Sequence, residues 1–404
     1  MWTTIISPLG RSLRPIRLIL PHVFSLLLLV PCLARSHDLP IETLRLPPGF
    51  QISVFAELTN PRQLALSESG IVYAGSRRAG HLYGILDANS DGSADKVVTI
   101  DHDLRLPTGI AIRDGDLYVG AVNRLLVYQN IDQTFESSPE PSVLYDQLPV
   151  ETHHGWKYLG FSPEGKLFFN VGAPCNVCLK ENPWFATIMS LDLEREPLQP
   201  EVFSRGVRNT VGFSWHPDTG ELWFTDNGRD LLGDDTPSCE LNRAPKAGLH
   251  FGFPYMHARS VIDPKFGAPA FPVEPPVVEL GPHVAPLAMK FYTGTMLPAR
   301  YRGEIFIAEH GSWNRTQKAG HTGYNITIVN PETGAKSILI DGWLQNNVAW
   351  GRPTDILEMP DGSLLIADDH ADVIYRLSYE APSVRGTVEP DRLAPAVNTV
   401  VVGP

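Results

Sequence analysis

Apolar and polar residues alternate in one short unit that recurs along the chain. In each copy a turn containing glycine leads into a strand in which hydrophobic residues alternate with other types, as in "EGKLFFNVG" (164–172). A period of two is typical of a strand that buries one face, and the glycine permits the positive φ that a tight hairpin needs. Six copies are present, with glycines at positions 70, 115, 165, 220, 303 and 362.

The spacing of these units predicts a six-bladed β-propeller. A shorter apolar strand precedes each copy, and a third strand often follows, as in "ATIMSLDL" (186–193). Three or four antiparallel strands every 45–60 residues or so describe four-stranded blades around a central channel. The alternative is a pair of β-sandwiches, which does not require six near-identical glycine turns. A longer interval separates the fourth and fifth units, and its proline-rich segment 257–286 has no periodicity and predicts a loop.

The first 34 residues have the pattern of a secretory signal peptide. Arg11, Arg14 and Arg17 precede the apolar segment 18–34, and small residues lead up to Ala34. We predict cleavage after Ala34, followed by export to the periplasm or secretion. An uncleaved membrane anchor is the alternative, but the apolar core is short for a membrane span, so no stable membrane insertion is predicted. The predicted organisation is signal peptide 1–34, propeller 35–380 and C-terminal tail 381–404.

Composition and charge narrow the class of protein. The chain of 404 residues has 43% hydrophobic but only 19% charged residues, with 34 glycines and 36 prolines, which favours short strands and many loops. The net charge of -12 argues against a nucleic-acid partner. Cys175, Cys178 and Cys239 remain after cleavage, and one disulfide plus one free thiol is expected in an oxidising compartment. The sequence leaves the pairing open.

Residues with distinctive chemistry lie just before or after the repeated strands. In a propeller these loops converge on one face, so the residues should meet there. Arginines suit carboxylates or phosphates, an oxygen-rich loop suits Ca²⁺, and a histidine suits proton abstraction. The pattern predicts a pocket for a polyanionic ligand, a cation and a base. The candidates are His153, His154, Arg208, Asn209, the loop 226–235, His283, His310, Arg315, Arg352 and Asp355.

Four segments together resemble the sorbosone dehydrogenase family, the soluble sugar and aldose dehydrogenases that use pyrroloquinoline quinone (PQQ). They are "HHGWKYLGFSPEGKLFFNVG" (153–172), "GVRNTVGFSWHPDTGELWFTDNGRDLLGDD" (206–235), "AEHGSWNR" (308–315) and "GRPTDILEMPDGSLLIADD" (351–369). The resemblance extends over roughly 40–380. It implies oxidation of a sugar or aldehyde at C1 with PQQ and Ca²⁺, and transfer of electrons to a separate acceptor, a cytochrome or a quinone.

The resemblance also implies roles for individual residues. His154 matches the general base that takes the proton of the C1 hydroxyl while hydride passes to PQQ, whereas His153 is expected to shape the loop. Arg208 matches the arginine that neutralises charge developing beside the quinone. Further matches are Asn209, Arg315 and Arg352 with cofactor-binding positions, and the backbone carbonyls of Gly228 and Arg229 with the ligands of Ca²⁺.

One departure keeps alternatives open. In the better-known soluble sugar dehydrogenases a carboxylate supports the base, just after the glycine of the following strand. Here Ala173 follows Gly172, and "APCNVC" replaces the acidic stretch. A Ca²⁺-dependent propeller lactonase and a propeller that binds a ligand without catalysis are the alternatives. The missing carboxylate favours the non-catalytic propeller, and the retained histidine and arginines favour the dehydrogenase.

Two further patterns have structural explanations as well as functional ones. The segment "DANSDGSAD" (87–95) resembles the start of an EF-hand loop, but Val98 stands where the bidentate acid would fall, and a polar turn is the alternative. Trp156 and Trp313 adjoin candidate site residues and are the tryptophans expected at the pocket. Trp215, Trp223 and Trp343 are expected in the core between blades.

Overall fold

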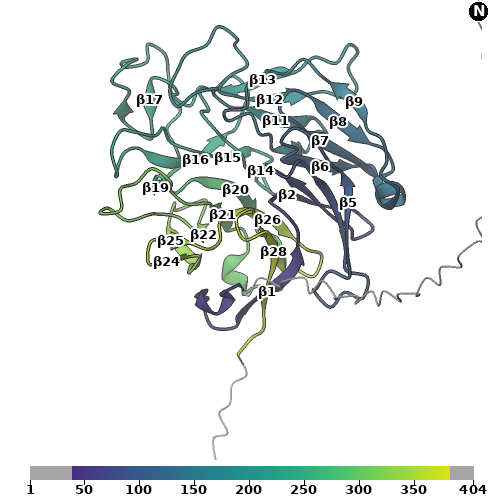
Figure 1. Ribbon diagram of the computed structural model, residues 1–404. Coiled ribbons are helices and arrows are strands. Elements are labelled where there is room, and N and C mark those ends of the chain that lie inside the picture. Colours follow the sequence, from purple (N-terminus) through teal and green to yellow (C-terminus); the bar gives the residue numbers. More distant parts are fainter. Residues whose placement is uncertain (1–38, 383–404) are drawn as a thin grey trace, which may run out of the picture. The chain divides into compact units, whose positions relative to one another are not determined.

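Six four-stranded antiparallel sheets form the blades of a propeller in the computed structural model, which describes residues 39–382. The first strands of neighbouring blades contact one another, and the labels of β2, β6, β14, β20 and β26 lie around the middle of the ring in Figure 1. The predicted fold class is confirmed.

Blades one to three are β2 (Pro61–Leu66), β3 (Val72–Ser76), β4 (Leu82–Leu86), β5 (Lys96–Asp101); β6 (Gly109–Arg113), β7 (Asp116–Gly120), β8 (Leu125–Tyr128), β9 (Ser142–Tyr145); and β10 (Leu159–Phe161), β11 (Leu167–Val171), β12 (Thr187–Leu191), β13 (Glu201–Arg205). Blades four to six are β14 (Phe213–Trp215), β15 (Leu222–Asp226), β16 (Ser238–Ala244), β19 (Val278–Pro282); β20 (Pro286–Phe291), β21 (Ile305–Glu309), β22 (Asn325–Val329), β23 (Lys336–Ile340); and β26 (Pro353–Glu358), β27 (Leu364–Asp368), β28 (Val373–Tyr379), β1 (Phe50–Glu57).

The six repeated glycines lie in the turns between the first and second strands of the blades. All six have φ between 69° and 88°, the left-handed region that glycine adopts without a steric penalty. At Gly303, φ is 82° and no atom lies within 4 Å of the position that a Cβ would occupy. The glycine is therefore required there by the conformation of the turn and not by lack of space.

Replacing Gly303 with alanine should lower the free energy of unfolding by about 1–2 kcal/mol, which is what an L-residue loses in the left-handed region. Asparagine tolerates that region better, so Gly303→Asn should lose less than Gly303→Ala. Urea unfolding followed by tryptophan fluorescence measures both. Equal losses in the two variants would show that the left-handed turn is not the reason for the glycine.

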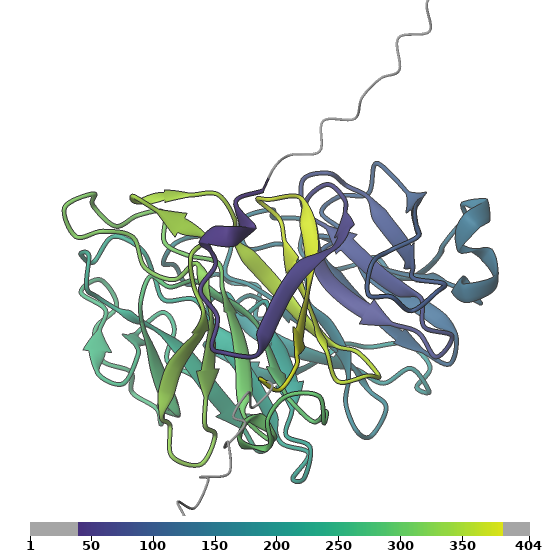
Figure 2. The ribbon, with the colours of Figure 1, turned by 90° about the horizontal axis from the view of Figure 1, so that it is seen from below.

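The last blade is completed by the N-terminal strand. β1 pairs antiparallel with β28, with Phe50 opposite Tyr379 and Glu57 opposite Val373, and Figure 2 shows the purple strand beside the yellow-green ones. A two-residue bridge between Arg45 and Asp341 also joins the segment before β1 to the end of β23 in blade five. The ring is thus closed by hydrogen bonds between the two ends of the described chain.

The excursion between blades four and five is more ordered than predicted. Segment 257–286 was expected to be a loop, but it contains β19, the outer strand of blade four, and most of the small hairpin of β17 (Met256–His257) and β18 (Val261–Ile262). The remaining short elements are α1 (Ile131–Thr134), η1 (Ile41–Thr43), η2 (Phe135–Ser137), η3 (Ala299–Tyr301), β24 (Leu344–Gln345) and β25 (Val348–Ala349).

Hydrophobic side chains pack between neighbouring blades. Tyr73 and Leu82 of the first blade, for example, pack with Ile110 of the second. Trp343 is fully buried and Trp223 nearly so, as expected for the inter-blade core. Within residues 39–382 no helix combines the length and the hydrophobicity of a membrane span. The predicted signal peptide and most of the predicted C-terminal tail lie outside the described residues.

Candidate functional site

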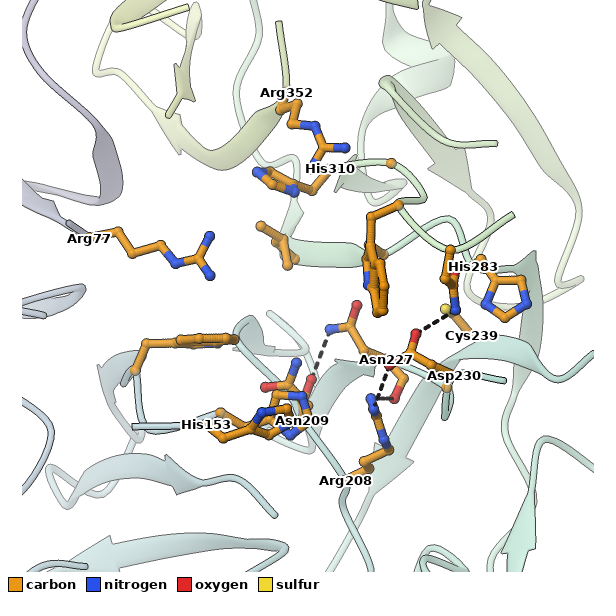
Figure 3. Close-up of a pocket in the computed structure, with 18 of the residues that line it drawn as sticks. Arg77, His153, Arg208, Asn209, Asn227, Asp230, Cys239, His283, His310 and Arg352 are labelled. Atoms are coloured by element: carbon orange, nitrogen blue, oxygen red, sulfur yellow. Dashed lines mark hydrogen bonds and ion pairs between the residues drawn. The ribbon is translucent and has the colours of Figure 1, made fainter. Parts of the chain in front are cut away.

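A cavity of about 460 Å³ lies where the loops of five blades meet. Its walls come from segments at the start of first strands and at the end of second strands, and these lie at one edge because the two strands are antiparallel. Figure 3 shows charged side chains from opposite walls directed into this space. The predicted residues His154, Arg208, Asn209, Gly228 and Arg352 all line it. The other polar lining residues are Arg62, Arg77, His153, Asn227, Asp230, His283, His310 and Asn314.

His154 is buried in the wall with a defined tautomer. Its Nδ1 lies 2.8 Å from the carbonyl oxygen of Ala173, which can only accept, so Nδ1 carries the hydrogen and Nε2 keeps its lone pair. Burial lowers the pKa of His154 well below its ordinary value, and the charge of Arg208 and the His153 ring lower it further. A neutral imidazole with a free lone pair is the form that a general base needs.

The backbone around His154 explains the neighbouring glycine. His154 has a φ of 51°, a conformation that is uncommon for a non-glycine residue and often marks a functional site. A Cβ on Gly172 would lie 2.6 Å from the carbonyl oxygen of His154 and 2.7 Å from its Cβ, so only glycine fits. The His153 ring packs against His154 with centroids 4.1 Å apart. His153 also lines the cavity.

Arg208 is held by neighbouring loops in a fixed orientation. Its Nε donates to the carbonyl of Asn176 at 2.9 Å and its Nη1 to the carbonyl of Asn227 at 3.0 Å. Its Nη2 donates to the Asn176 side chain at 3.0 Å and to the carboxylate of Asp230 at 3.1 Å. Beside it, the Oδ1 of Asn209 is buried without a hydrogen-bond partner in the described structure. An acceptor of this kind at a cavity wall is suited to a ligand donor or a cation.

Arg62 and Arg77, which the sequence analysis did not predict, complete the positive wall together with the predicted Arg352. The guanidinium of Arg77 stacks on Trp156 at 4.6 Å, and no hydrogen bond or ion pair within residues 39–382 engages it. Burial and the nearby charge of Arg62 lower the pKa of Arg77 to about 10. Arg352 donates to the hydroxyl of Tyr324 at 2.9 Å. Such a concentration of cations in one cavity is suited to an anionic ligand.

A buried ion network supports this wall. Asp369 accepts from the Nε2 of His310 at 2.7 Å and from the Nη1 of Arg62 at 2.9 Å. Burial lowers the pKa of His310 to about 4, so its ring is neutral near pH 7 and donates a hydrogen bond. The full charge on Arg62 compensates the carboxylate. Both partners of Asp369 line the cavity, so this network positions them.

Some of the predicted residues lie elsewhere. The Nε of Arg315 donates to the carbonyl of Gly320 at 2.6 Å and its Nη1 to Asp235 at 3.0 Å, and it does not line the cavity. Arg315 is therefore not part of the proposed site. Asp355 lines a separate small cavity in the channel and accepts from the backbone of Leu64 at 2.6 Å.

The two candidate cation sites, the carbonyls of Gly228 and Arg229 and the EF-hand-like segment 87–95, differ in whether their oxygen atoms are free to bind a cation. No group of three or more His, Cys, Asp or Glu side chains in residues 39–382 is arranged to hold a metal ion. In the same range, no hydrogen bond ends on the carbonyl oxygen of Gly228 or Arg229, so both keep lone pairs free. The EF-hand-like segment instead uses its acids internally, since Asp87 accepts from the backbone of Gly92 at 2.9 Å and Asp91 from that of Ser93 at 2.9 Å.

The three cysteines form one disulfide and one free thiol, as expected. Cys175 and Cys178 are bonded to each other, and Cys239 is free and buried at the cavity wall. Burial raises the pKa of Cys239 to about 11, so its thiol is inert as a nucleophile near neutral pH.

Comparisons with known proteins agree with the fold. Residues 192–375 match the family described as glucose/sorbosone dehydrogenase, and residues 44–251 match the family described as TrAA12-like. A protein of Borreliella burgdorferi, described as uncharacterized, is 33% identical over 360 residues, which cover 84% of this chain and 92% of that protein. The family match and the fold support a propeller sugar oxidoreductase. The TrAA12-like model covers more than half of the chain, so the chain belongs to that family, and the match of residues 192–375 confirms the predicted resemblance to the sorbosone dehydrogenases.

Solved structures show the same fold at low sequence identity. The PQQ domain of pyranose dehydrogenase from Coprinopsis cinerea, in its holo form, has a TM-score of 0.70 at 20% identity, with 83% of this chain and 97% of that chain covered. The PQQ-bound aldose sugar dehydrogenase of Streptomyces coelicolor has a TM-score of 0.58 at 17% identity, with coverages of 83% and 100%. The soluble aldose sugar dehydrogenase of Escherichia coli, in its apo form, has a TM-score of 0.60 at 16% identity, with coverages of 82% and 100%.

Proposed function

We propose that this chain is an exported, PQQ- and Ca²⁺-dependent dehydrogenase that oxidises a sugar or an aldehyde at C1. The observation that carries the proposal is the neutral imidazole of His154, whose free Nε2 shares a cavity with Arg77, Arg208 and Arg352. His154 takes the proton of the substrate hydroxyl at Nε2. Arg208 places positive charge beside the oxygen on which negative charge develops.

The cavity has the features that PQQ requires. PQQ carries three carboxylates on a planar ring system, and when bound it accepts a hydride from the carbon being oxidised. Arg77 and Arg352 are placed to hold carboxylates, with Arg62 behind them. The Nε1 of Trp156 and the Oδ1 of Asn209 are buried without partners in the described structure, so both remain available to a polar ligand. The residues present therefore fit this cofactor.

A calcium ion fits the oxygen atoms beside this cavity. The carbonyls of Gly228 and Arg229 are hard donors that no described hydrogen bond uses, and Ca²⁺ prefers such ligands. Ca²⁺ here would supply positive charge next to the cofactor. Export rests on the signal-peptide pattern that ends at Ala34. The electrons then go to a separate cytochrome or quinone.

The test uses the mature chain, purified and stripped of metal with a chelator. PQQ is titrated with and without added Ca²⁺ while tryptophan fluorescence is followed, since Trp156 and Trp313 line the cavity. Aldoses and aldehydes are then assayed with a dye as electron acceptor. We expect saturable quenching and dye reduction that require both additions. If PQQ neither binds nor supports turnover, the proposal is wrong, and the same protein should be assayed on lactones.

Replacing Arg77 with glutamine should weaken PQQ binding by about 10- to 100-fold, because a hydrogen bond between charged groups contributes about 1.5–3 kcal/mol. The fluorescence titration measures this change. Arg78→Gln is the matched control, since Arg78 is the exposed neighbour and does not line the cavity. Equal affinities in the two variants would contradict the assignment of Arg77 as a cofactor ligand.

A further inference from the structure

The loop that follows β11 contacts both of the principal site residues. The carbonyl of Ala173 fixes the Nδ1 of His154 at 2.8 Å, and its backbone N–H donates to the carbonyl of Arg208 at 2.8 Å. Three residues later, Asn176 receives two hydrogen bonds from the guanidinium of Arg208. This segment, 173–178, is the one in which an acidic residue was expected and is missing.

Asn176 also ties Arg208 to the loop after β15. Its Oδ1 accepts from the backbone N–H of Asp230 at 2.8 Å, and its Nδ2 donates to the carbonyl of Asp230 at 2.9 Å. The carboxylate of Asp230 in turn accepts from Arg208 and, at 2.6 Å, from the Nδ2 of Asn314. Asn176 thus joins blade three to blade four through its own four hydrogen bonds and through those of Asp230.

The disulfide closes the backbone on either side of this side chain. Cys175 and Cys178 flank Asn176 and Val177, and their Cα atoms lie 6.1 Å apart. A closed loop of this length has few conformations, so the carbonyl and the side chain of Asn176 are presented together in one orientation. Of the two enclosed residues, Asn176 is hydrogen-bonded to Arg208 and Asp230, whereas Val177 has no polar side-chain atom and does not line the cavity.

We propose that Asn176 is a positioning residue that aims Arg208 and Asp230 at the cavity, and that the disulfide between Cys175 and Cys178 holds Asn176 in place for this task. The inference rests on the proposed function in assigning Arg208 to the developing charge. It adds a residue that lies behind the cavity wall and does not itself touch a ligand. A rigid second layer is important because small displacements of a positioned charge lower the rate strongly.

The first test compares Asn176→Ala with Val177→Ala, a change in the same closed loop. Asn176→Ala should lower kcat by about 10- to 100-fold and change the KM for the sugar less, because Arg208 acts on charge that develops during the reaction. Val177→Ala should retain kcat. Asn176→Asp keeps both oxygen acceptors for Arg208 and loses the donor to Asp230, so it should recover much of the rate that alanine loses.

The second test needs neither cofactor nor turnover. The titration of His154 is followed in the apoprotein by NMR of its ring, with His154→Gln identifying the signal. Arg208, His153 and Arg77 are the charged or titratable groups that act on this ring. If Asn176→Ala lets Arg208 move away, the titration midpoint of the His154 ring should rise by about one pH unit. Val177→Ala should leave this midpoint unchanged.

The outcomes separate the inference from the proposed function. A wild-type protein that neither binds PQQ nor reduces the dye would contradict the proposed function. The titration of His154 would still test whether Asn176 positions Arg208. Identical kcat values and His154 midpoints in Asn176→Ala and Val177→Ala would overturn the positioning role. The double variant Cys175→Ser/Cys178→Ser keeps the Asn176 side chain and should shift both readouts in the same direction. If it matches the wild type, the disulfide has no part in holding Asn176.

Circular dichroism and thermal melting accompany each variant. If Asn176→Ala does not fold, the double serine variant and Asn176→Asp carry the same comparison. We expect both to fold, because Asn176 and the two cysteines are only partly buried and lie outside the strands.

Discussion

Replacing His154 with glutamine should lower kcat for sugar oxidation by about 10²- to 10⁴-fold, the contribution usual for a positioned general base. Glutamine has a similar size but no basic lone pair near neutral pH. PQQ affinity should change little, because the proposed cofactor contacts come from Arg77, Arg352 and neighbouring residues and not from the base. Steady-state kinetics with the dye acceptor, together with the PQQ titration, measure the two effects separately.

The pH dependence gives a second readout of the same residue. Burial, Arg208 and His153 lower the pKa of His154 well below 6.5, and the base acts when unprotonated. Activity should therefore persist below pH 6.5 and fall as the pH is lowered through the His154 pKa. His102→Gln is the control, because His102 is an exposed histidine beside Asp103. A loss smaller than tenfold in His154→Gln would assign the base to another group.

The fold could be predicted to the extent that its signals are local. Each glycine hairpin is encoded within about ten residues, so the first two strands of every blade were predicted correctly. The pairing of Phe50 with Tyr379 joins distant segments, and a local repeat carries no information about it. β19 was missed because prolines at positions 275, 276, 282 and 286 lie in and around Val278–Pro282, and prolines argue against a strand.

The site was predictable where a residue has distinctive neighbours along the chain. His154, Arg208 and Arg352 lie in motifs that follow or precede a repeated strand, and the structure brings them to one cavity. Arg77 stands in "GSRRAG", which is indistinguishable in sequence from a surface turn; its stacking on Trp156 depends on packing between blades. Arg315 is adjacent in sequence to Asn314 of the cavity wall, but its loop directs it away.

The missing carboxylate partner of His154 illustrates a further limit. A side chain can be sought in the sequence, but a backbone carbonyl is present at every residue. That the carbonyl of Ala173 meets Nδ1 at 2.8 Å depends on the left-handed backbone of His154 and on the absence of a Cβ at Gly172. The departure from the family pattern therefore removes a charge but not the hydrogen bond that selects the tautomer.

Replacing Asp369 with alanine should lower the free energy of unfolding by about 3–5 kcal/mol, the cost of breaking a buried ion pair by removing one partner. Arg62 would be left buried without its carboxylate, and His310 would lose its acceptor. Both side chains line the cavity, so PQQ binding should weaken as well. Asp369→Asn retains one acceptor and should lose less. Urea unfolding at pH 7 measures the stabilities, and the fluorescence titration measures the affinities.

The direction in which the pKa of Asp369 is shifted determines how the free energy of unfolding changes with pH. Burial acts to raise the pKa of this carboxyl, but His310 and Arg62 outweigh it and hold the pKa well below its usual value. The stabilisation is therefore present in full above about pH 4, the unfolded-state pKa, and is lost as the pH falls through the folded-state pKa. The difference in stability between wild type and Asp369→Asn should narrow below pH 4. Asp341→Ala removes a bidentate Arg–Asp pair at the surface, where solvent screens the charges, and should leave the unfolding midpoint nearly unchanged. Equal losses in Asp369→Ala and Asp341→Ala would mean that burial does not set the strength of the Asp369 network, and the supporting role assigned to it beneath the arginine wall would then be wrong.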